Sequence, residues 1–472
     1  MTDDPMRLLA AALVLLGWLA LCAVIVARER RRRRRAAREA AGMVPAEDGR
    51  EPVLVAFASQ TGFAEQLAWQ TARLLRGAGV PVQLSALGQL GLEQLGGYRR
   101  ALFVVSTYGE GDPPDNASAF ARRVMSDSGA LSQLSYAVLA LGDRAYANFC
   151  GFGRSLDQWL SRQGAQPLFE RVDVDNAAEK GLKYWQSQLA RLAGIEAVED
   201  AGPADGWGAA PFESWRLAER RLLNPGSSGE PLYHIELTPP GSADASPDGG
   251  VASPSWQAGD LVQMRVPADP EHPRDYSIAS LPADGRLHLL VRAQLRTDGT
   301  PGLASALLCH GLAEGDSVEL RLRPNRGFRL DGNEQRPLIL VGNGSGFAGL
   351  RALLKARAAA GGKPPCWLVF GERQQAHDDL YRDEVQAWLD SGLLARADRV
   401  FSRDQPQRLY VQDRIEQSAD ALRAWVADGA AIYVCGSLEG MAGGVDAALR
   451  RVLGDGAVEQ LRDEGRYRRD VY

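Results

Sequence analysis

Short apolar runs alternate with longer amphipathic stretches between about residues 51 and 194. Each run has about six residues, which suits a strand that is buried on both faces of a parallel sheet. The stretches between the runs have the periodicity of helices that cover such a sheet. The pattern predicts a doubly wound α/β unit, whose ligand-binding loops lie at the carboxyl ends of the strands. The runs are VLVAFA (53–58), VQLSAL (82–87), ALFVVS (101–106), YAVLAL (136–141) and PLFERV (167–172).

A second set of elements follows a glycine- and proline-bearing segment at 195–210, which we interpret as a linker. Strand-like runs occupy residues 232–237 and 260–266. Farther along, a run at 337–341 leads into the turn Gly342-Asn343-Gly344-Ser345-Gly346 and then a helical stretch. A glycine-rich turn between a strand and a helix lets the backbone approach a dinucleotide, so this turn is a candidate nucleotide site.

The N-terminal segment has a different pattern. Residues 8–27 carry no charge and as a helix would span about 30 Å, the thickness of a bilayer core. Acidic residues precede this segment, and the arginine-rich run 28–35, broken only by Glu29, follows it. That order differs from a cleaved signal peptide and predicts a retained anchor with the rest of the chain in the cytoplasm. We therefore expect a single-pass protein of the inner membrane, with residues 28–50 as a basic tether.

Composition narrows the function further. The formal net charge is -5 over 472 residues, which makes nucleic acid an unlikely target. The five cysteines form no CxxC pair and predict thiols in a reducing compartment. The five histidines are scattered without ligand spacing, so we predict no protein-bound metal.

Three loops at strand ends carry the chemistry of the first unit. The loop after 53–58 offers hydroxyls and backbone amides at a helix N-terminus, which is a phosphate cradle that needs no lysine. The loops after 101–106 and 136–141 each combine glycine with one tyrosine, an arrangement that suits a flat heteroaromatic ring. In order and position the three loops resemble the FMN-binding domain of the flavodoxin family, in the version of the P450 reductase and sulfite reductase flavoproteins.

This resemblance implies an FMN site. Ser59 to Ala64 would hold the phosphate, Tyr108 and Tyr146 would flank the ring, and Asp175 would lie at a flavin-contacting loop. The implied residues are Ser59, Gln60, Thr61, Gly62, Phe63, Ala64, Ser106, Thr107, Tyr108, Gly109, Glu110, Gly111, Leu141, Gly142, Asp143, Tyr146, Phe149 and Asp175.

The second half contains an ordered series of motifs. It begins with Arg-Asp-Tyr-Ser at 274–277, where the arginine can neutralise a pyrophosphate and the tyrosine can stack on a flavin. Gly302 then opens a short helix, and the glycine turn, the 402–412 segment, Cys435 and the ending Arg-Asp-Val-Tyr follow. This series resembles the ferredoxin-NADP reductase family, and its ending is closest to the sulfite reductase flavoprotein.

The resemblance implies sites for FAD and NADPH. Ser277, Cys435 and Asp470 would surround the hydride-transfer site, and Tyr472 would cover the flavin face where nicotinamide arrives. The FAD residues would be Arg274, Tyr276, Ser277, Gly302, Leu303, Ala304, Ser305 and Tyr472. The NADPH residues would be Gly344, Ser345, Gly346, Ser402, Arg403, Arg408, Tyr410 and Gln412. Two arginines and two hydroxyls at a dianionic phosphate favour NADPH over NADH.

The implied organisation has six parts. They are an anchor (1–27), a tether (28–50), a flavodoxin-like FMN domain (51–194), a linker (195–210), an FAD-binding β-barrel (211–335) and an NADP-binding α/β domain (336–472). Almost nothing separates Pro270 from Pro273, where the related reductases insert a helical connecting domain. In addition, Asn343 and Gly349 replace prolines, and Gly444 stands where an acidic residue is common.

We therefore expect an NADPH-dependent diflavin reductase that passes electrons from NADPH to FAD to FMN and on to a haem or siroheme protein. Two flavins in series would convert a two-electron hydride donor into a one-electron donor. One alternative is a reductase that serves a membrane electron carrier, for example in ferric-siderophore reduction. Another, of a different class, is a membrane-tethered flavin-binding module without turnover.

Overall fold

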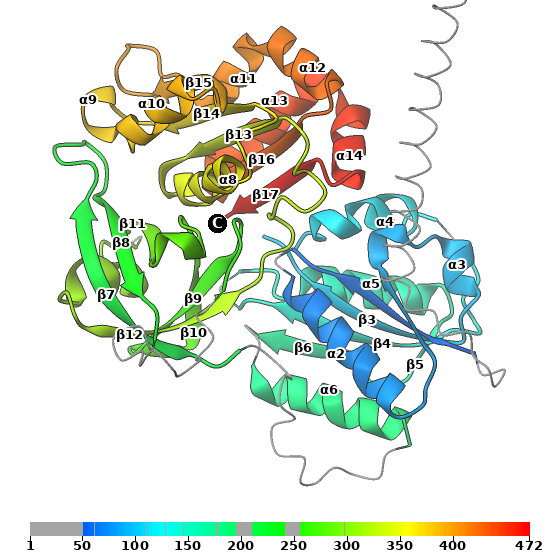
Figure 1. Ribbon diagram of the computed structural model, residues 1–472. Coiled ribbons are helices and arrows are strands. Elements are labelled where there is room, and N and C mark those ends of the chain that lie inside the picture. Colours follow the sequence, from blue (N-terminus) through cyan, green and yellow to red (C-terminus); the bar gives the residue numbers. More distant parts are fainter. Residues whose placement is uncertain are drawn as a thin grey trace, which may run out of the picture.

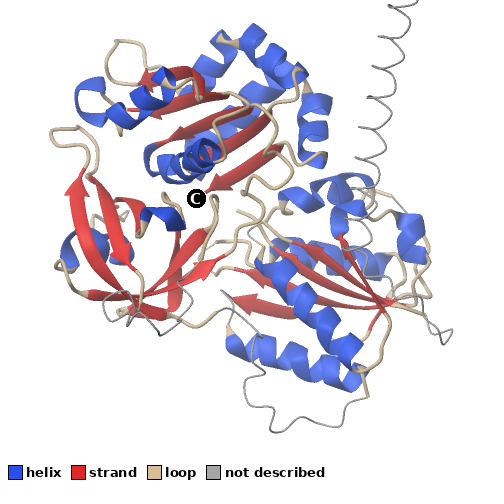
Figure 2. Ribbon diagram, in the orientation of Figure 1, coloured by secondary structure: helices blue, strands red, loops and turns tan. Residues whose placement is uncertain are grey.

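The computed structural model describes residues 51–194, 210–240 and 255–472, apart from positions 61, 110, 128, 145, 176, 177 and 297. The described chain forms three sheets, each in a separate unit, and the three units meet around the last residue of the chain (Figure 1). Figure 2 shows that helices cover two of the sheets on both faces, while the third sheet curls into a barrel.

The first unit is the doubly wound α/β unit expected from the sequence, and we call it the FMN unit. Its parallel strands have the order β2-β1-β3-β4-β5, and β6 also pairs with β4. The order reverses between β1 and β3, which is where such a sheet opens a binding crevice. The strands are β1 (Val53–Ala58), β2 (Val82–Ala86), β3 (Arg100–Ser106), β4 (Ser135–Gly142), β5 (Gln166–Pro167) and β6 (Val172–Asp175).

The predicted strand at 167–172 is wrong in its limits. The chain pairs only through Gln166 and Pro167, leaves the sheet, and pairs again from Val172 onward. Pro167 has no amide hydrogen, and the Leu168 amide makes the last bond of this stretch to β4, to the Tyr136 carbonyl oxygen at 2.7 Å. In β6, Val172 and Val174 are buried while Asp173 faces outward, an alternation that the apolar run at 167–169 obscured.

Helices cover both faces of this sheet. One apolar core lies beneath α2 and α6, and the other lies beneath α4 and α5. All members of both cores belong to residues 53–193, so the FMN unit contains its own hydrophobic core. The helices are α2 (Phe63–Gly77), α3 (Leu92–Gly96), α4 (Ser118–Arg123), α5 (Gly151–Arg162) and α6 (Glu179–Leu192).

Replacing Gly153 with alanine is expected to destabilise the FMN unit by about 1–3 kcal/mol, although alanine is the better helix former. A Cβ at Gly153 would lie 2.3 Å from the Cβ of Ala140, so α5 would have to move off the sheet. Urea unfolding followed by the fluorescence of Trp159 and Trp185 measures the effect. Gly77→Ala is the matched control, because nothing lies within 4 Å of the added Cβ. Equal stability of the two variants would contradict this close packing.

The second unit is an antiparallel barrel with the strand order β10-β9-β12-β7-β8-β11. Its β10 passes through Pro270 and Pro273 as one irregular strand, so no helical domain is inserted there. The helical elements are a 3₁₀ turn (Pro282–Asp284), α7 (Leu303–Ala306) and the turn that follows α7. The strands are β7 (Glu213–Leu222), β8 (Leu232–Thr238), β9 (Leu261–Val266), β10 (Asp269–Ser277), β11 (Leu287–Arg292) and β12 (Ser317–Arg323).

The third unit, which we call the NADPH unit, is a parallel sheet with the order β15-β14-β13-β16-β17. Helices α8 and α10 cover one face, and α11 to α14 cover the other. The strands are β13 (Leu338–Asn343), β14 (Cys366–Glu372), β15 (Leu394–Phe401), β16 (Ala431–Gly436) and β17 (Tyr467–Val471). The helices are α8 (Phe347–Ala359), α9 (Gln375–Asp378), α10 (Arg382–Asp390), α11 (Val411–Gln417), α12 (Ala419–Ala427), α13 (Gly443–Leu453) and α14 (Asp455–Asp463).

The barrel and the NADPH unit share apolar packing. One buried cluster joins Leu232, Ala279, Leu290 and Phe328 of the barrel to residues of α8 and the parallel sheet. Burial of this kind contributes about 25 cal/mol per Å² of apolar surface and does not weaken with salt. These two units are therefore expected to behave as one body.

The structure does not bear out the localisation that the sequence predicts. In the described chain no helix is both long and apolar enough to cross a membrane. The longest described helix, α2, has 15 residues, whereas a bilayer core of about 30 Å needs about 20. The predicted anchor (1–27) and tether (28–50) lie outside the described residues. The prediction of a single-pass protein of the inner membrane is withdrawn, because no described helix supports it.

Candidate functional site

A cavity of about 690 Å³ lies where the three units meet. The FMN unit lines it with the loops after β1, β3 and β4, including Gln60, Tyr108 and Tyr146. The barrel and the C-terminal residues line the opposite side, including Arg274, Ser277, Asp470 and Tyr472. Residues predicted for FMN and residues predicted for FAD therefore line one continuous space.

The loop after β1 forms a tight turn at the start of α2. Gly62 has a φ of 88°, and its amide donates a hydrogen bond of 2.8 Å to the hydroxyl of Ser59. The amide of Ser59 donates to Asn116 Oδ1 at 3.0 Å, so the loop is tied to the segment that follows β3. Because α2 begins here, its free amides face the loop and favour an anion. This geometry suits the predicted phosphate cradle.

The two aromatic loops present their tyrosines differently. Tyr108 is largely buried, and neither its hydroxyl nor the Thr107 hydroxyl has a hydrogen-bond partner among the described residues. Tyr146 is 38% exposed at the rim. The glycines at 109 and 111 have φ values of 50° and 119°, which bend the β3 loop around the cavity. Asp175, also predicted for FMN, instead accepts a hydrogen bond of 3.1 Å from the amide of Arg144.

The predicted FAD residues lie on the barrel. Arg274 reaches the cavity, and its guanidinium pairs with Asp269 Oδ2 at 3.2 Å. Tyr276 packs against the barrel core rather than lining the cavity. Gly302 begins α7, and the Ser305 hydroxyl accepts from the Gln294 amide at 3.2 Å. Leu303 and Ala304 complete the first turn of α7.

Three side chains from three elements converge beside the cavity. The Ser277 hydroxyl, at the end of β10, donates to Asp470 Oδ2 at 2.7 Å. Cys435 Sγ, at the end of β16, lies 3.7 Å from the same oxygen. Burial raises the pKa of Asp470 to about 6, although the hydrogen bond from Ser277 acts to lower it. Burial also raises the pKa of Cys435 well above its usual value. The structure thus brings the predicted hydride-transfer residues together.

Tyr472 closes the cavity from the NADPH unit. The residue as a whole is 49% exposed, and its hydroxyl donates to Ser345 Oγ at 3.1 Å. Its backbone is fixed on both sides, because the Tyr472 amide donates to Gly436 and the Leu438 amide donates to Tyr472. A ring held by one exposed hydroxyl contact can swing away without breaking the backbone pairing.

The glycine turn packs closely on the neighbouring strand. A Cβ at Gly346 would lie 2.1 Å from the carbonyl oxygen of Cys435, so only glycine fits there. Asn343, which replaces a proline, accepts a hydrogen bond of 3.1 Å from the Ser437 amide and so links the ends of β13 and β16. At Gly349 a Cβ would lie 3.1 Å from Cys435 Sγ. These departures from the family pattern therefore have packing roles.

The residues predicted for the adenosine phosphate lie beyond the end of β15. Ser402 is buried, whereas Arg403, Arg408 and Tyr410 are exposed. Within the described chain neither arginine forms an ion pair, so both charges are available to a ligand. Gln412, in α11, fills the space beside Gly444. A Cβ at Gly444 would lie 3.0 Å from the amide carbon of Gln412, so a larger residue there would require the Gln412 side chain to move.

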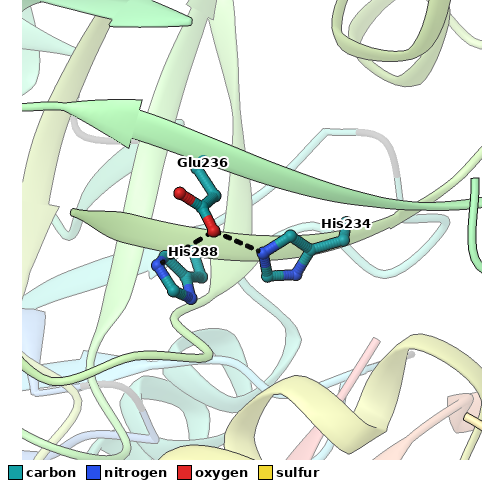
Figure 3. A group of neighbouring side chains, drawn as sticks. All are labelled: His234, Glu236 and His288. Carbon is teal, nitrogen blue, oxygen red and sulfur yellow. Dashed lines mark hydrogen bonds and ion pairs between the residues drawn. The ribbon is translucent and has the colours of Figure 1, made fainter. Parts of the chain in front are cut away.

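One group of side chains in the described chain has the residue types and the spacing of a metal site. His234, Glu236 and His288 come together because β8 and β11 pair, although their sequence spacing gave no sign of it (Figure 3). Arg351, which can only donate, lies 3.3 Å from His288 Nδ1, so the His288 proton belongs on Nε2 and points at Glu236. Tyr381 bonds His234 Nδ1 at 2.6 Å.

This group is better explained as a closed hydrogen-bond network. Burial lowers the pKa of both histidines, that of His288 to about 4, so both rings are neutral near pH 7. Arg286 donates to the second oxygen of Glu236 at 2.9 Å. Two guanidinium groups beside the carboxylate and the rings disfavour a further cation. The network joins the barrel to Tyr381 and Arg351 of the NADPH unit, and the absence of a bound metal stays a prediction.

Sequence reasoning missed two ion pairs, one between the FMN unit and β17 and one beside the glycine turn. Arg469 and Asp115 form an ion pair between β17 and the loop after β3. Arg292 pairs with Glu372 at 2.7 Å and lies against the glycine turn, 3.1 Å from where a Gly344 Cβ would stand. For Arg469 a signal existed, since side chains alternate along a strand and Arg469 must face away from Asp470.

The residues present fit flavins and a nucleotide. A cavity of this size is in the usual range for a cofactor, and buried hydroxyls such as those of Thr107 and Tyr108 ordinarily have partners. Thr61 and Glu110 lie outside the described residues. The predicted site residues that line the cavity are Gln60, Phe63, Ser106, Thr107, Tyr108, Gly109, Leu141, Gly142, Asp143, Tyr146, Phe149, Arg274, Ser277, Asp470 and Tyr472.

Comparison with known proteins agrees with this geometry. Residues 55–185 match the Flavodoxin family, and residues 340–447 match the Oxidoreductase NAD-binding domain family. The Sulfite reductase (NADPH) flavoprotein alpha-component of Neisseria meningitidis serogroup B is 31% identical, over 89% of each chain. Proteins of the same name from Serratia proteamaculans and Salmonella typhi are 28% identical, over 92% of each chain.

Proposed function

Because the chain belongs to the NADPH-dependent diflavin reductase family, we propose that it delivers electrons from NADPH, through FAD and FMN, to a haem or siroheme protein. It is an oxidoreductase whose cofactors are FMN, FAD and NADPH. The alternative of a flavin-binding module without turnover is thereby set aside. The membrane-carrier alternative depended on the predicted localisation, and the described chain contains no helix that could cross a membrane.

The cavity shared by the two flavin sites is the observation that carries this proposal. A reductase that served only as a store of flavin would not need the FMN loops to face the FAD residues across one space. The balance of the reaction is simple: NADPH gives NADP⁺, one proton and two electrons, and two one-electron acceptors take those electrons. When bound, the flavins supply the step between a two-electron donor and one-electron acceptors.

The residues of this chain would serve that reaction as follows. Ser277 and Cys435 hold the Asp470 carboxylate at the edge of the cavity, where its charge favours the positive nicotinamide ring of the product. Tyr472 covers the same place and has to swing aside for the nicotinamide. Tyr108 and Tyr146 enclose the opposite end and limit the access of water.

An anaerobic NADPH titration tests the proposal. The purified protein is expected to contain FAD and FMN in equal amounts and to bleach fully with about two equivalents of NADPH, because each flavin takes two electrons. Reduction of cytochrome c and of a sulfite reductase haemoprotein component should follow. A protein with one flavin, or one that NADPH does not bleach, would refute the proposed function. Turnover with dyes but with no haem protein would refute the proposed acceptor.

A further inference from the structure

The FMN unit contacts the other units through polar groups. Its apolar cores contain no residue of the barrel or of the NADPH unit, whereas those two units share one. The contacts across this boundary include Arg122 with Glu459 at 2.5 Å, Arg123 with Asp463 at 3.4 Å and Glu65 with Arg326 at 3.2 Å. A boundary of this kind opens more readily than an apolar one.

One ion pair at this boundary differs from the others in burial. The side chains of Arg469 and Asp115 are only 15% and 18% exposed, whereas those of Arg123 and Asp463 are 70% and 39% exposed. Exposed pairs contribute about 0–1 kcal/mol, but breaking a shielded pair leaves a charge without a partner and costs more. Burial by itself would lower the pKa of Arg469, yet the neighbouring Asp115 carboxylate outweighs it and the pKa is raised.

The Arg469–Asp115 pair is also tied to the FMN loops. Asp115 accepts a hydrogen bond of 3.1 Å from the Gln60 side chain, and its amide donates to Gln60 Oε1 at 2.9 Å. The guanidinium carbon of Arg469 lies 5.4 Å from the ring centre of Tyr108. The pair therefore touches both the phosphate loop and the aromatic loop.

The other side of the same strand holds the hydride-transfer residues. Successive side chains of β17 face opposite ways, so Arg469 points to the FMN unit while Asp470 points to Ser277 and Cys435. Two adjacent residues thus connect the two flavin sites through one rigid strand.

We propose that Arg469 is a positioning residue, whose ion pair with Asp115 latches the FMN-binding loops against β17 in the closed arrangement of the units. The latch rests on the proposed function, since a closed arrangement matters only where electrons cross between the two flavin sites. Arg469 lines the shared cavity, but its guanidinium pairs with Asp115, on the other side of β17 from Asp470. Its removal is therefore expected to affect the FMN unit while leaving hydride transfer intact.

Stopped-flow reduction by NADPH and small-angle X-ray scattering of the whole protein test this latch together. In Arg469→Gln, hydride transfer is expected to stay within about twofold of wild type, while reduction of the FMN unit slows about tenfold or more as the closed population falls. The radius of gyration at low salt should rise toward the wild-type value at high salt, where ion pairs are screened. Arg123→Gln is the matched control and should change neither quantity.

Exchanging the two charges of the pair distinguishes loss of the latch from a folding defect. Asp115→Arg combined with Arg469→Glu should restore reduction of the FMN unit to within about threefold of wild type, because the pair is reformed with its charges reversed. Equal slowing of hydride transfer and FMN reduction in Arg469→Gln would overturn the proposal, since Arg469 would then act through Asp470. Unchanged scattering and unchanged FMN reduction would overturn it as well. A wild-type protein that NADPH does not reduce would refute the proposed function, and scattering alone would still decide the latch.

Discussion

Replacing both Arg403 and Arg408 with alanine is expected to raise the KM for NADPH about 100-fold or more and to leave the KM for NADH nearly unchanged. Each arginine would donate charge-assisted hydrogen bonds to the 2′-phosphate, worth about 1.5–3 kcal/mol apiece, and about 1.4 kcal/mol corresponds to a tenfold change in affinity. NADH lacks this phosphate. The exposure of both guanidinium groups and their lack of an ion pair in the described chain support this assignment.

Steady-state kinetics with both nucleotides measures the effect. Arg423→Ala is the matched control, because Arg423 is a half-exposed arginine of the same unit on α12, where it pairs with Asp420 at 2.9 Å. A parallel rise of both KM values would show that the arginines act on the fold or on groups common to the two nucleotides. An unchanged KM for NADPH would place the phosphate elsewhere.

The second large effect is expected at Asp470. Replacing Asp470 with asparagine and Cys435 with alanine should slow hydride transfer about 100-fold or more, the usual effect of removing an electrostatic contact to developing charge. Since burial raises the pKa of Asp470 to about 6, the wild-type rate should increase with pH through that value as the carboxylate ionises. The variant should lose this dependence. Stopped-flow reduction between pH 5 and pH 8 measures both, and an unchanged rate would refute the assignment.

The single variant Asp470→Asn should gain stability, whereas the double variant loses hydride-transfer rate. The folded-state pKa of Asp470 lies above its ordinary value of 3.8, so the ionised carboxylate costs stability. This cost is complete above pH 6 and disappears as the pH falls from 6 toward 4. Asp470→Asn should therefore be more stable than wild type at pH 7, by on the order of 1–3 kcal/mol, and gain little at pH 4. Asp428→Asn, at an exposed carboxylate of the same unit, is the control.

The parallel sheets were predictable because their evidence is local. Each buried strand carries its own apolar run, and each binding loop follows its strand directly, as Gly62 and Tyr108 do. The limits of β5 and β6 were not predictable in the same way, because pairing with β4 stops after Leu168 and resumes at Val172 within one apparent run. The domain limits stay a prediction, as do the roles of the site residues.

The contacts between units could not be read from the sequence. Arg469 and Asp115 are 354 positions apart, and Asp115 belongs to no motif. His234, Glu236 and His288 likewise meet only because β8 and β11 pair in one register. Such contacts depend on how strands pair and how folded units pack together, and hydrophobic periodicity carries no information about either. Alternation along the last strand was the one available clue to the position of Arg469.

The unequal boundaries of the three units set where the molecule can be cut and recombined. Since the barrel and the NADPH unit share a buried cluster, neither could be exchanged for that of a relative without rebuilding the cluster around Phe328 and Leu290. The apolar cores of the FMN unit contain only its own residues, and ion pairs connect this unit to the other two. A foreign flavodoxin could therefore be grafted in its place, provided that it supplied a carboxylate opposite Arg469.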